Sequence, residues 1–155
     1  MKLSYRYLLT ILTVFLFVGN VHSQDKRVGI ALQSEPGKNI LVEKNEQAKL
    51  SDKGPTLFFL QKGLVDPSLV SFRYALNESY YLRHFNFVIN LHKRPKPGTI
   101  FDADATFRME KGTDNTVRFN SFNYPDRYLA VRSDGVLIVQ ANAPLDKSTF
   151  IIQDK

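Results

Sequence analysis

The residue types best suited to chemistry occur in two short phrases: "YLRHFNF", which contains His84, Phe85 and Phe87, and "ADATF", which contains Asp104. A carboxylate can accept hydrogen bonds from two neighbouring hydroxyl groups, and an imidazole adds a further donor or acceptor. Aromatic rings beside them can pack on C–H surface and exclude water. Together, these four side chains would suit a ligand that presents several hydroxyl groups.

Each polar candidate also has a purely structural interpretation. His84 could end a strand with its hydrogen bonds satisfied inside the fold, and Asp104 could form a turn or cap backbone N–H groups. Asp102 lies two residues from Asp104, so we expect it to face another way and to lie at the surface. His92 falls in the basic segment "HKRPKPG", where Pro and Gly indicate a turn. We interpret this segment as a solvated loop rather than a nucleic-acid contact.

The segments that must position these residues are repeated along the chain. "LVSFRYALNESYYLRH" matches "TVRFNSFNYPDRYLAV", which aligns Phe72 with Phe119 at an offset of 47 residues. A weaker first copy begins at "RVGIALQSEPGKNILVEKNEQAKL" and closes at "PTLFFLQKGL", with Ile40 where the second copy has Tyr81. Self-similarity with this period indicates a repeat architecture. The three units span about residues 27–67, 68–115 and 116–155.

Each unit consists of short β-like segments separated by turn residues. In the second unit these are "VSFRYAL", "YYLRHF", "FVINLH" and "TFRME", and the alternation of Phe87, Ile89 and Leu91 with other residues is typical of half-buried strands. No amphipathic helix of useful length is present. Four strands in each of three units, closed so that no edge is exposed, predict an all-β protein with a β-trefoil fold. The repeated apolar residues are then core: Phe72, Leu82, Phe107, Phe119, Leu129 and Phe150.

The first 23 residues have the layout of a secretory signal peptide, with a basic start, the apolar run "YLLTILTVFLFVG" and a cleavage site near Ser23. We therefore expect the mature chain, residues 24–155, to be secreted or periplasmic, with no membrane span. The absence of cysteine excludes disulfide bonds and a cysteine-anchored lipoprotein. Two histidines in the mature chain give no metal-ligand spacing, so neither a metal nor another cofactor is expected. The formal charge of +6 is scattered along the chain and does not predict nucleic-acid binding.

"YYLRHFNF" followed by "TIFDADATF", and "SFNYPDRYL" in the next unit, resemble the arabinose-binding domain of the α-L-arabinofuranosidase B family, also known as carbohydrate-binding module family 42. The resemblance covers most of the mature chain and is strongest in the second unit. It implies a β-trefoil whose units can each hold a pocket for an arabinofuranose side chain of arabinoxylan or arabinan. It also implies that His84, Phe85, Phe87 and Asp104 bind that sugar.

The other two units lack the polar residues that the resemblance places in the pocket. The third unit has Val131 and Lys147 at the positions of the histidine and the aspartate, and the first unit has Glu43 and Pro55 there. Three units are needed to close a trefoil core, whereas a sugar site can persist in one of them. We therefore expect a single pocket, in the second unit.

These observations predict an exported carbohydrate-binding module for arabinofuranosyl side chains. Its expected partner is an arabinose-containing polysaccharide or oligosaccharide, and a separate glycoside hydrolase is compatible with this role. One alternative is a structural or protein-interaction trefoil with degenerate sugar sites, because fold does not establish function. Arabinofuranosidase activity in this chain is less favoured, because Asp102 and Asp104 are too close in sequence to flank a scissile bond and no residues remain for a catalytic domain.

Overall fold

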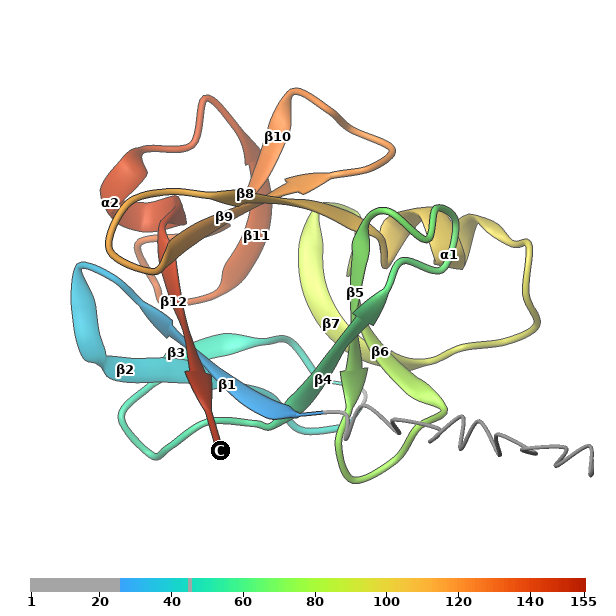
Figure 1. Cartoon of the computed structure of the whole chain (residues 1–155), viewed down its shortest axis with the longest axis horizontal. Coiled ribbons are helices and arrows are strands. Elements are labelled where there is room, and N and C mark those ends of the chain that lie inside the picture. Colours follow the sequence, from blue (N-terminus) through green and yellow to red (C-terminus); the bar gives the residue numbers. More distant parts are fainter. Residues whose placement is uncertain (1–25, 45) are drawn as a thin grey trace, which may run out of the picture.

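The computed structural model describes residues 26–44 and 46–155, and the signal peptide predicted for residues 1–23 lies outside them. The described chain consists of twelve strands and two short helices, so the all-β prediction is confirmed. Figure 1 shows three lobes around a common centre, coloured blue to cyan, green to yellow and orange to red. None of the helices in these two ranges is long and apolar enough to cross a membrane.

Each lobe contains four strands in chain order. The first unit contains β1 (Arg27–Leu32), β2 (Glu35–Leu41), β3 (Lys49–Ser51) and β4 (Phe58–Lys62). The second unit contains β5 (Val70–Tyr74), β6 (Tyr80–Phe85), β7 (Val88–Lys93), α1 (Ile100–Asp104) and β8 (Phe107–Lys111). The third unit contains β9 (Thr116–Ser121), β10 (Arg127–Val131), β11 (Leu137–Ala141), α2 (Leu145–Ser148) and β12 (Phe150–Asp154).

Six of the strands close into a barrel. Within each unit the first strand pairs with the fourth, and the fourth strand of each unit pairs with the first strand of the next, always antiparallel. The two middle strands of each unit form a hairpin, β2–β3, β6–β7 and β10–β11. The bridges Gln47–Asn90 and Lys49–Val136 and the β7–β11 pairing link the three hairpins. This is the architecture of a β-trefoil, and closure leaves the barrel without a free edge.

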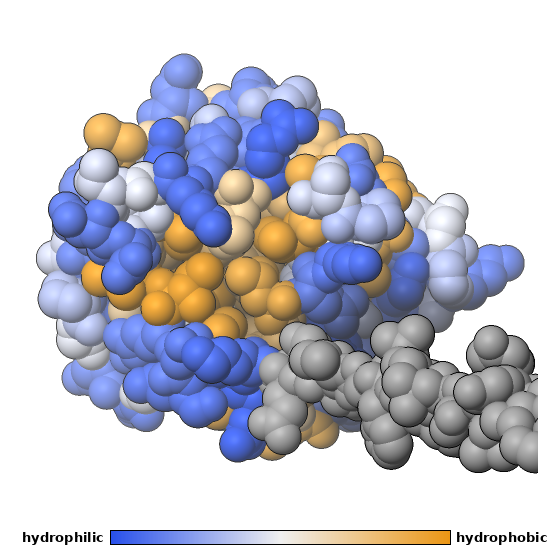
Figure 2. All heavy atoms as spheres, viewed as in Figure 1, coloured by the Kyte–Doolittle hydropathy of each residue, from blue (hydrophilic) through white to orange (hydrophobic). Residues whose placement is uncertain are grey.

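The core is built from the repeated apolar positions. All six residues predicted to be core are at most 2% exposed. Phe72 lies in the middle of the aromatic cluster, with its ring centroid 4.9 Å from that of Phe119 and 5.8 Å from that of Phe107. Figure 2, from the same direction as Figure 1, shows apolar residues near the middle of this face with hydrophilic residues around them. Equivalent residues of the three units therefore pack against one another and not only within their own unit.

The alternation predicted around β7 is correct in part. Ile89 and Leu91 are fully buried, as expected. Asn90 is also buried, because its side chain donates to the backbone carbonyl of Val88 and it bridges to the first unit's hairpin. Phe87 does not share the strand's buried face, since it lies in the turn that precedes β7. Strand β7 is thus packed on both of its faces. The turn that precedes it carries Phe87.

Candidate functional site

A pocket of about 290 Å³ opens beside the turn between β6 and β7, and we call it the unit-two pocket. Four predicted residues, His84, Phe85, Phe87 and Asp104, all line it. Strand β6 and its turn supply the first three, and the C-terminal end of α1 supplies the fourth. The remaining lining residues are Arg83, Asn86, Ile100 and Tyr124, the last of these from the third unit. The structure therefore brings together residues that lie up to 41 positions apart in the sequence.

Asp104 lies at the centre of the polar contacts in this pocket and is 7% exposed. Its Oδ2 accepts a hydrogen bond from the Arg83 guanidinium at 3.0 Å, and its Oδ1 accepts one from Asn123 Nδ2 at 2.8 Å. Oδ1 also lies 3.4 Å from His84 Nε2. A carboxylate oxygen can accept more than one hydrogen bond. Asp104 is therefore held in a fixed orientation and still has acceptor capacity for a ligand hydroxyl.

The hydrogen bonds of Asn123 determine the tautomer of His84. Because Asn123 donates its Nδ2 to Asp104, its Oδ1 is the atom that lies 2.9 Å from His84 Nε2. The same Oδ1 accepts from Ser121 Oγ at 3.0 Å. An amide oxygen can accept but not donate, so the shared proton is on His84 Nε2. In the neutral ring Nδ1 is then an acceptor, and the described residues offer it no hydrogen-bond partner.

Aromatic rings form the apolar side of the pocket. The Phe87 and Tyr124 rings meet edge to face with centroids 5.0 Å apart, and each also contacts the His84 ring. The Arg127 guanidinium lies over Phe87, 4.1 Å from the ring centroid. Phe85 also lines the pocket and is 52% exposed. Exposed rings around a small polar centre are suited to the C–H faces of a polyhydroxylated ligand.

The position of Phe87 depends on an unusual turn. Phe85 pairs with Val88, so Asn86 and Phe87 form a two-residue connection between β6 and β7. Both have positive φ, 50° for Asn86 and 64° for Phe87. These are values of a type I′ turn, whose second position favours glycine. A phenylalanine there is uncommon, and strained backbone of this kind is concentrated at functional sites.

Phe87→Gly is expected to keep the turn and weaken ligand binding. Glycine adopts the observed φ freely, so the hairpin should form, whereas the ring contact is lost. A lost aromatic contact of about 0.5–1.5 kcal/mol corresponds to a roughly two- to tenfold higher Kd. The measurement is a calorimetric titration with an arabinofuranosyl oligosaccharide, with thermal unfolding to verify the fold. An unchanged Kd in a folded variant would mean that Phe87 is not part of the binding surface.

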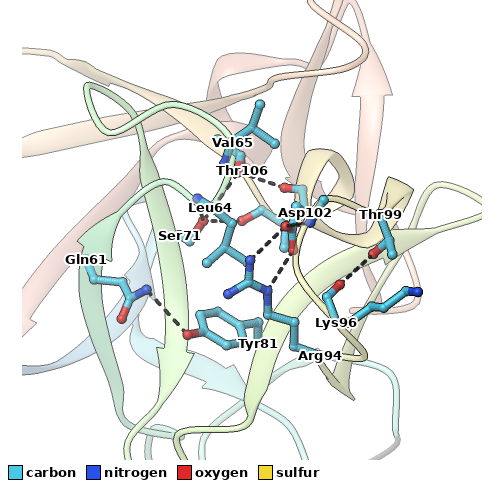
Figure 3. Close-up of polar contacts among 12 residues, drawn as sticks. Gln61, Leu64, Val65, Ser71, Tyr81, Arg94, Lys96, Thr99, Asp102 and Thr106 are labelled. Carbon is cyan, nitrogen blue, oxygen red and sulfur yellow. Dashed lines mark hydrogen bonds and ion pairs between the residues drawn. The ribbon is translucent and has the colours of Figure 1, made fainter.

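Asp102 is not at the surface, and that prediction was wrong. It faces away from Asp104, as expected for residues two apart on a helix, but that side of α1 is covered and Asp102 is 3% exposed. Both of its carboxylate oxygens accept from the Arg94 guanidinium, at 2.8 and 2.7 Å. The backbone N–H of Gly98 donates to it at 2.8 Å. Figure 3 shows Arg94 reaching toward Asp102.

The backbone of α1 is fixed from the same side. Thr106 Oγ1 donates to the Asp102 carbonyl at 2.7 Å, and Ser71 Oγ donates to the Ala105 carbonyl at 2.7 Å. Burial on its own would raise the pKa of Asp102, but the hydrogen bonds from Arg94 and Gly98 and the Arg94 charge hold it below its ordinary value. Asp102 therefore stays ionised and ties the loop before α1 to the helix that presents Asp104.

His92 is part of β7 and not of a solvated loop, so this prediction was also wrong. Its Nδ1 accepts a hydrogen bond from Arg83 Nε at 3.2 Å. Burial, and then the positive charge of Arg83, lowers the pKa of His92, which favours the neutral ring that this bond requires. Arg94, in the same basic segment, is ion-paired, whereas Lys96 and Pro97 are exposed as predicted.

Two residues of the third unit were missed by the sequence analysis. Asn123 and Tyr124 lie in the loop between β9 and β10 and complete the unit-two pocket. The phrase that contains them, "SFNYPDRYL", was recognised as part of the repeat, but no role was given to these two positions. The signal was weak because the pocket is assembled across a unit boundary, which becomes visible when the barrel closes.

In the described parts of the first and third units, no polar pair occupies the equivalent positions. Ile40 pairs with Leu50 across its hairpin as Leu82 does with Leu91, so Ile40 is equivalent to Leu82. The sequence analysis had aligned Ile40 with Tyr81, so the predicted register of the first unit was wrong by one residue. Val42, a buried core residue, therefore occupies the position of the pocket histidine, in place of the exposed Glu43. In the third unit that position is the buried Val131, and Lys147 lies 3.7 Å from Glu35. The hollow next to Lys147, about 410 Å³, is lined largely by charged residues.

A protein-family model described as the alpha-L-arabinofuranosidase B (ABFB) domain matches residues 32–153. The chain belongs to this family. The resemblance drawn from "YYLRHFNF" and "ADATF" is thus confirmed. No curated protein sequence matches this ABFB domain significantly.

Solved structures similar to this ABFB domain confirm the β-trefoil fold. An arabinofuranosidase complexed with arabinofuranosyl-α-1,2-xylobiose aligns with a TM-score of 0.71 and 20% identity over 83% of this chain and 31% of that chain. The domain therefore spans about a third of that enzyme's length. The BEL β-trefoil aligns with a TM-score of 0.66 and 17% identity, covering 88% of this chain and 98% of that one. The designed threefold-symmetric protein ThreeFoil aligns at 0.65 and 10% identity, covering 83% and 99%.

Proposed function

We propose that this ABFB domain is a carbohydrate-binding module that binds arabinofuranosyl side chains of arabinoxylan or arabinan through the unit-two pocket. The carrying observation is the convergence of an oriented carboxylate, a histidine of defined tautomer and exposed rings at one small pocket. A similar solved arabinofuranosidase was complexed with arabinofuranosyl-α-1,2-xylobiose, which supports this ligand class. We further propose, from the pattern of residues 1–23, that the protein is secreted or periplasmic.

In this proposal each group in the pocket has one task. Asp104 accepts hydrogen bonds from neighbouring hydroxyls of the furanose, and His84 Nδ1 accepts a further one. Phe87 and Tyr124 pack on the C–H surface of the ring and exclude water. Because few atoms are buried and each bond replaces one to water, the Kd for a single arabinofuranose should be on the order of 0.1–10 mM.

We propose that the module is non-catalytic. Glycoside hydrolysis uses two carboxyl groups about 5–10 Å apart on either side of the scissile bond. Asp104 is the acidic residue that lines the unit-two pocket, and the neighbouring Asp102 is buried in its bond with Arg94 and faces away. The part of the chain that the structure describes also contains no cluster of three side chains suited to a metal ion. A separate glycoside hydrolase would then supply the chemistry.

The proposal is tested by titrating the mature chain with an arabinofuranosyl-branched xylo-oligosaccharide and with its unbranched counterpart. We expect millimolar binding that requires the branch, because in this proposal the pocket receives the arabinofuranosyl group, which the unbranched xylan chain lacks. Release of arabinose from a chromogenic arabinofuranoside, measured at high protein concentration, should be absent. A folded protein that binds neither oligosaccharide would overturn the proposal and favour a trefoil that contacts proteins.

A further inference from the structure

A second hollow of about 430 Å³ adjoins the unit-two pocket, and we call it the adjacent hollow. Arg83 and Ile100 line both cavities, so the two cavities are neighbours on either side of these residues. Its other lining residues are His92, Lys93, Pro95, Thr99 and Phe101. A ligand whose terminal sugar occupies the unit-two pocket would therefore have its next sugar residues over this hollow.

The two cavities have opposite hydrogen-bonding character. The unit-two pocket contains the carboxylate of Asp104, an acceptor. The adjacent hollow is lined by donors. His92 accepts from Arg83 at Nδ1, so in the neutral ring its proton is on Nε2, which donates. Arg83 uses two of its five N–H donors on His92 and Asp104, and the others have no partner in the described residues.

The charge around the adjacent hollow is also unbalanced. The nearest carboxylates are already paired, Asp104 with Arg83 and Asp102 with Arg94. Lys93 is exposed at the end of β7 and has no ion-pair partner among residues 26–44 and 46–155. Its ammonium group is thus a surplus positive charge among the residues that line the hollow.

The apolar part of the hollow suits a ring and not an isolated ion. Phe101 and Pro95 line it beside Ile100, which is 70% exposed. The Arg83 guanidinium is held between two rings, with its central carbon 4.7 Å from the Phe85 centroid and 5.1 Å from the Phe101 centroid. A planar guanidinium oriented in this way can present its remaining N–H groups in a fixed direction.

From these observations we infer that the adjacent hollow binds a carboxylate-bearing sugar residue, a uronic acid, of the same polysaccharide whose arabinose enters the unit-two pocket. The inference rests on the proposed function and deepens it, because it selects acidic arabinoxylans over neutral ones. The carboxylate accepts from Arg83 and His92 and lies near the Lys93 ammonium, and the sugar ring packs on the exposed Ile100 and Pro95.

The experiment compares two arabinofuranosyl-branched xylo-oligosaccharides, one neutral and one with an added glucuronic acid branch, by calorimetry at about 20 mM and about 0.5 M salt. We expect the acidic ligand to bind the wild type about two- to fivefold more tightly at low salt, as for an exposed ion pair, and with little preference at high salt. Lys93→Gln should reduce the low-salt preference, because Arg83 and His92 still donate to the carboxylate. Lys53→Gln, an exposed lysine in the first unit, is the matched control and should keep the preference.

The outcomes separate this inference from the proposed function. Equal low-salt binding of both ligands by the wild type, or an undiminished preference in folded Lys93→Gln, contradicts a uronic-acid site in the adjacent hollow and leaves the unit-two pocket unaffected. Failure of a folded wild type to bind the neutral ligand overturns the proposed function. An acidic preference that Lys93→Gln reduces and Lys53→Gln retains in full supports the inference.

Discussion

Asp104→Ala is expected to abolish measurable binding of arabinofuranosyl ligands in a protein that is less stable, because its buried pair with Arg83 is broken, but still folded. The substitution removes the central acceptor of the unit-two pocket and leaves the Arg83 guanidinium and Asn123 Nδ2 without their partner. Hydrogen bonds to charged groups contribute about 1.5–3 kcal/mol each. Losing the bonds from the ligand hydroxyls to the Asp104 carboxylate should therefore raise the Kd roughly ten- to a hundredfold or more. From a millimolar starting point, calorimetry should detect no saturation.

The matched control is Lys147→Ala, which alters the equivalent position of the third unit. Lys147 lies near Glu35 in a charged hollow and has no part in the proposed site, so this variant should bind as the wild type does. Circular dichroism and thermal unfolding verify that both variants are folded. Normal binding by folded Asp104→Ala, or loss of binding in Lys147→Ala, would place the sugar elsewhere.

Asp102→Ala is expected to lower the free energy of unfolding by about 3–5 kcal/mol, because it breaks a buried ion pair from one side. Arg94 would lose both of its bonds to Asp102, and the Gly98 N–H would lose its acceptor. Such a loss is a large part of the 5–15 kcal/mol that stabilises a typical domain. Urea denaturation followed by tyrosine fluorescence measures the change.

The control for Asp102→Ala is Asp134→Ala, which breaks an exposed pair. Arg132 and Asp134 lie 2.6 Å apart with side chains 46% and 52% exposed, so this substitution should lower the free energy of unfolding much less than Asp102→Ala does. Equal destabilisation by both substitutions would show that burial of the Asp102–Arg94 pair does not increase the loss in free energy of unfolding.

Lowering the pH should reduce the contribution of Asp102 to the free energy of unfolding. The pKa of Asp102 in the folded state is below its ordinary value of 3.8. Its stabilisation is therefore fully present above pH 3.8 and is lost as the pH falls through the lower pKa of the folded state. The stability difference between the wild type and Asp102→Ala should therefore shrink on acidification. A difference that stays constant as the pH falls through this range would contradict the ionised pair.

The fold could be predicted from the sequence because the same residues are repeated for the same physical reason. Phe72 and Phe119 recur at one offset, and both are needed to fill a barrel that three units close together. The pocket residues of the second unit could be identified because His84 and Asp104 stand in a recognisable order on β6 and α1. Local sequence carries this information.

Contacts between segments far apart in the chain could not be predicted in the same way. Asn123 reaches Asp104 only because β8 and β9 are neighbours in the barrel, and nothing in "SFNYPDRYL" indicates that contact. The burial of Asp102 depends on its bonds with Arg94. Arg94 lies in the basic segment that the sequence analysis interpreted as a solvated loop. The register of the first unit became clear from the pairing of Ile40 with Leu50.

The most direct test of a single arabinofuranose site is an NMR titration of the mature chain with methyl α-L-arabinofuranoside. Signals of the His84 imidazole, the Phe87 ring and the Asn123 side-chain amide should shift in a saturable way with one millimolar Kd. The methyl signals of Val42 and Val131, at the equivalent positions of the other units, should not move. Absence of any shift, or saturable shifts centred on Val42 or Val131, would contradict binding through the unit-two pocket.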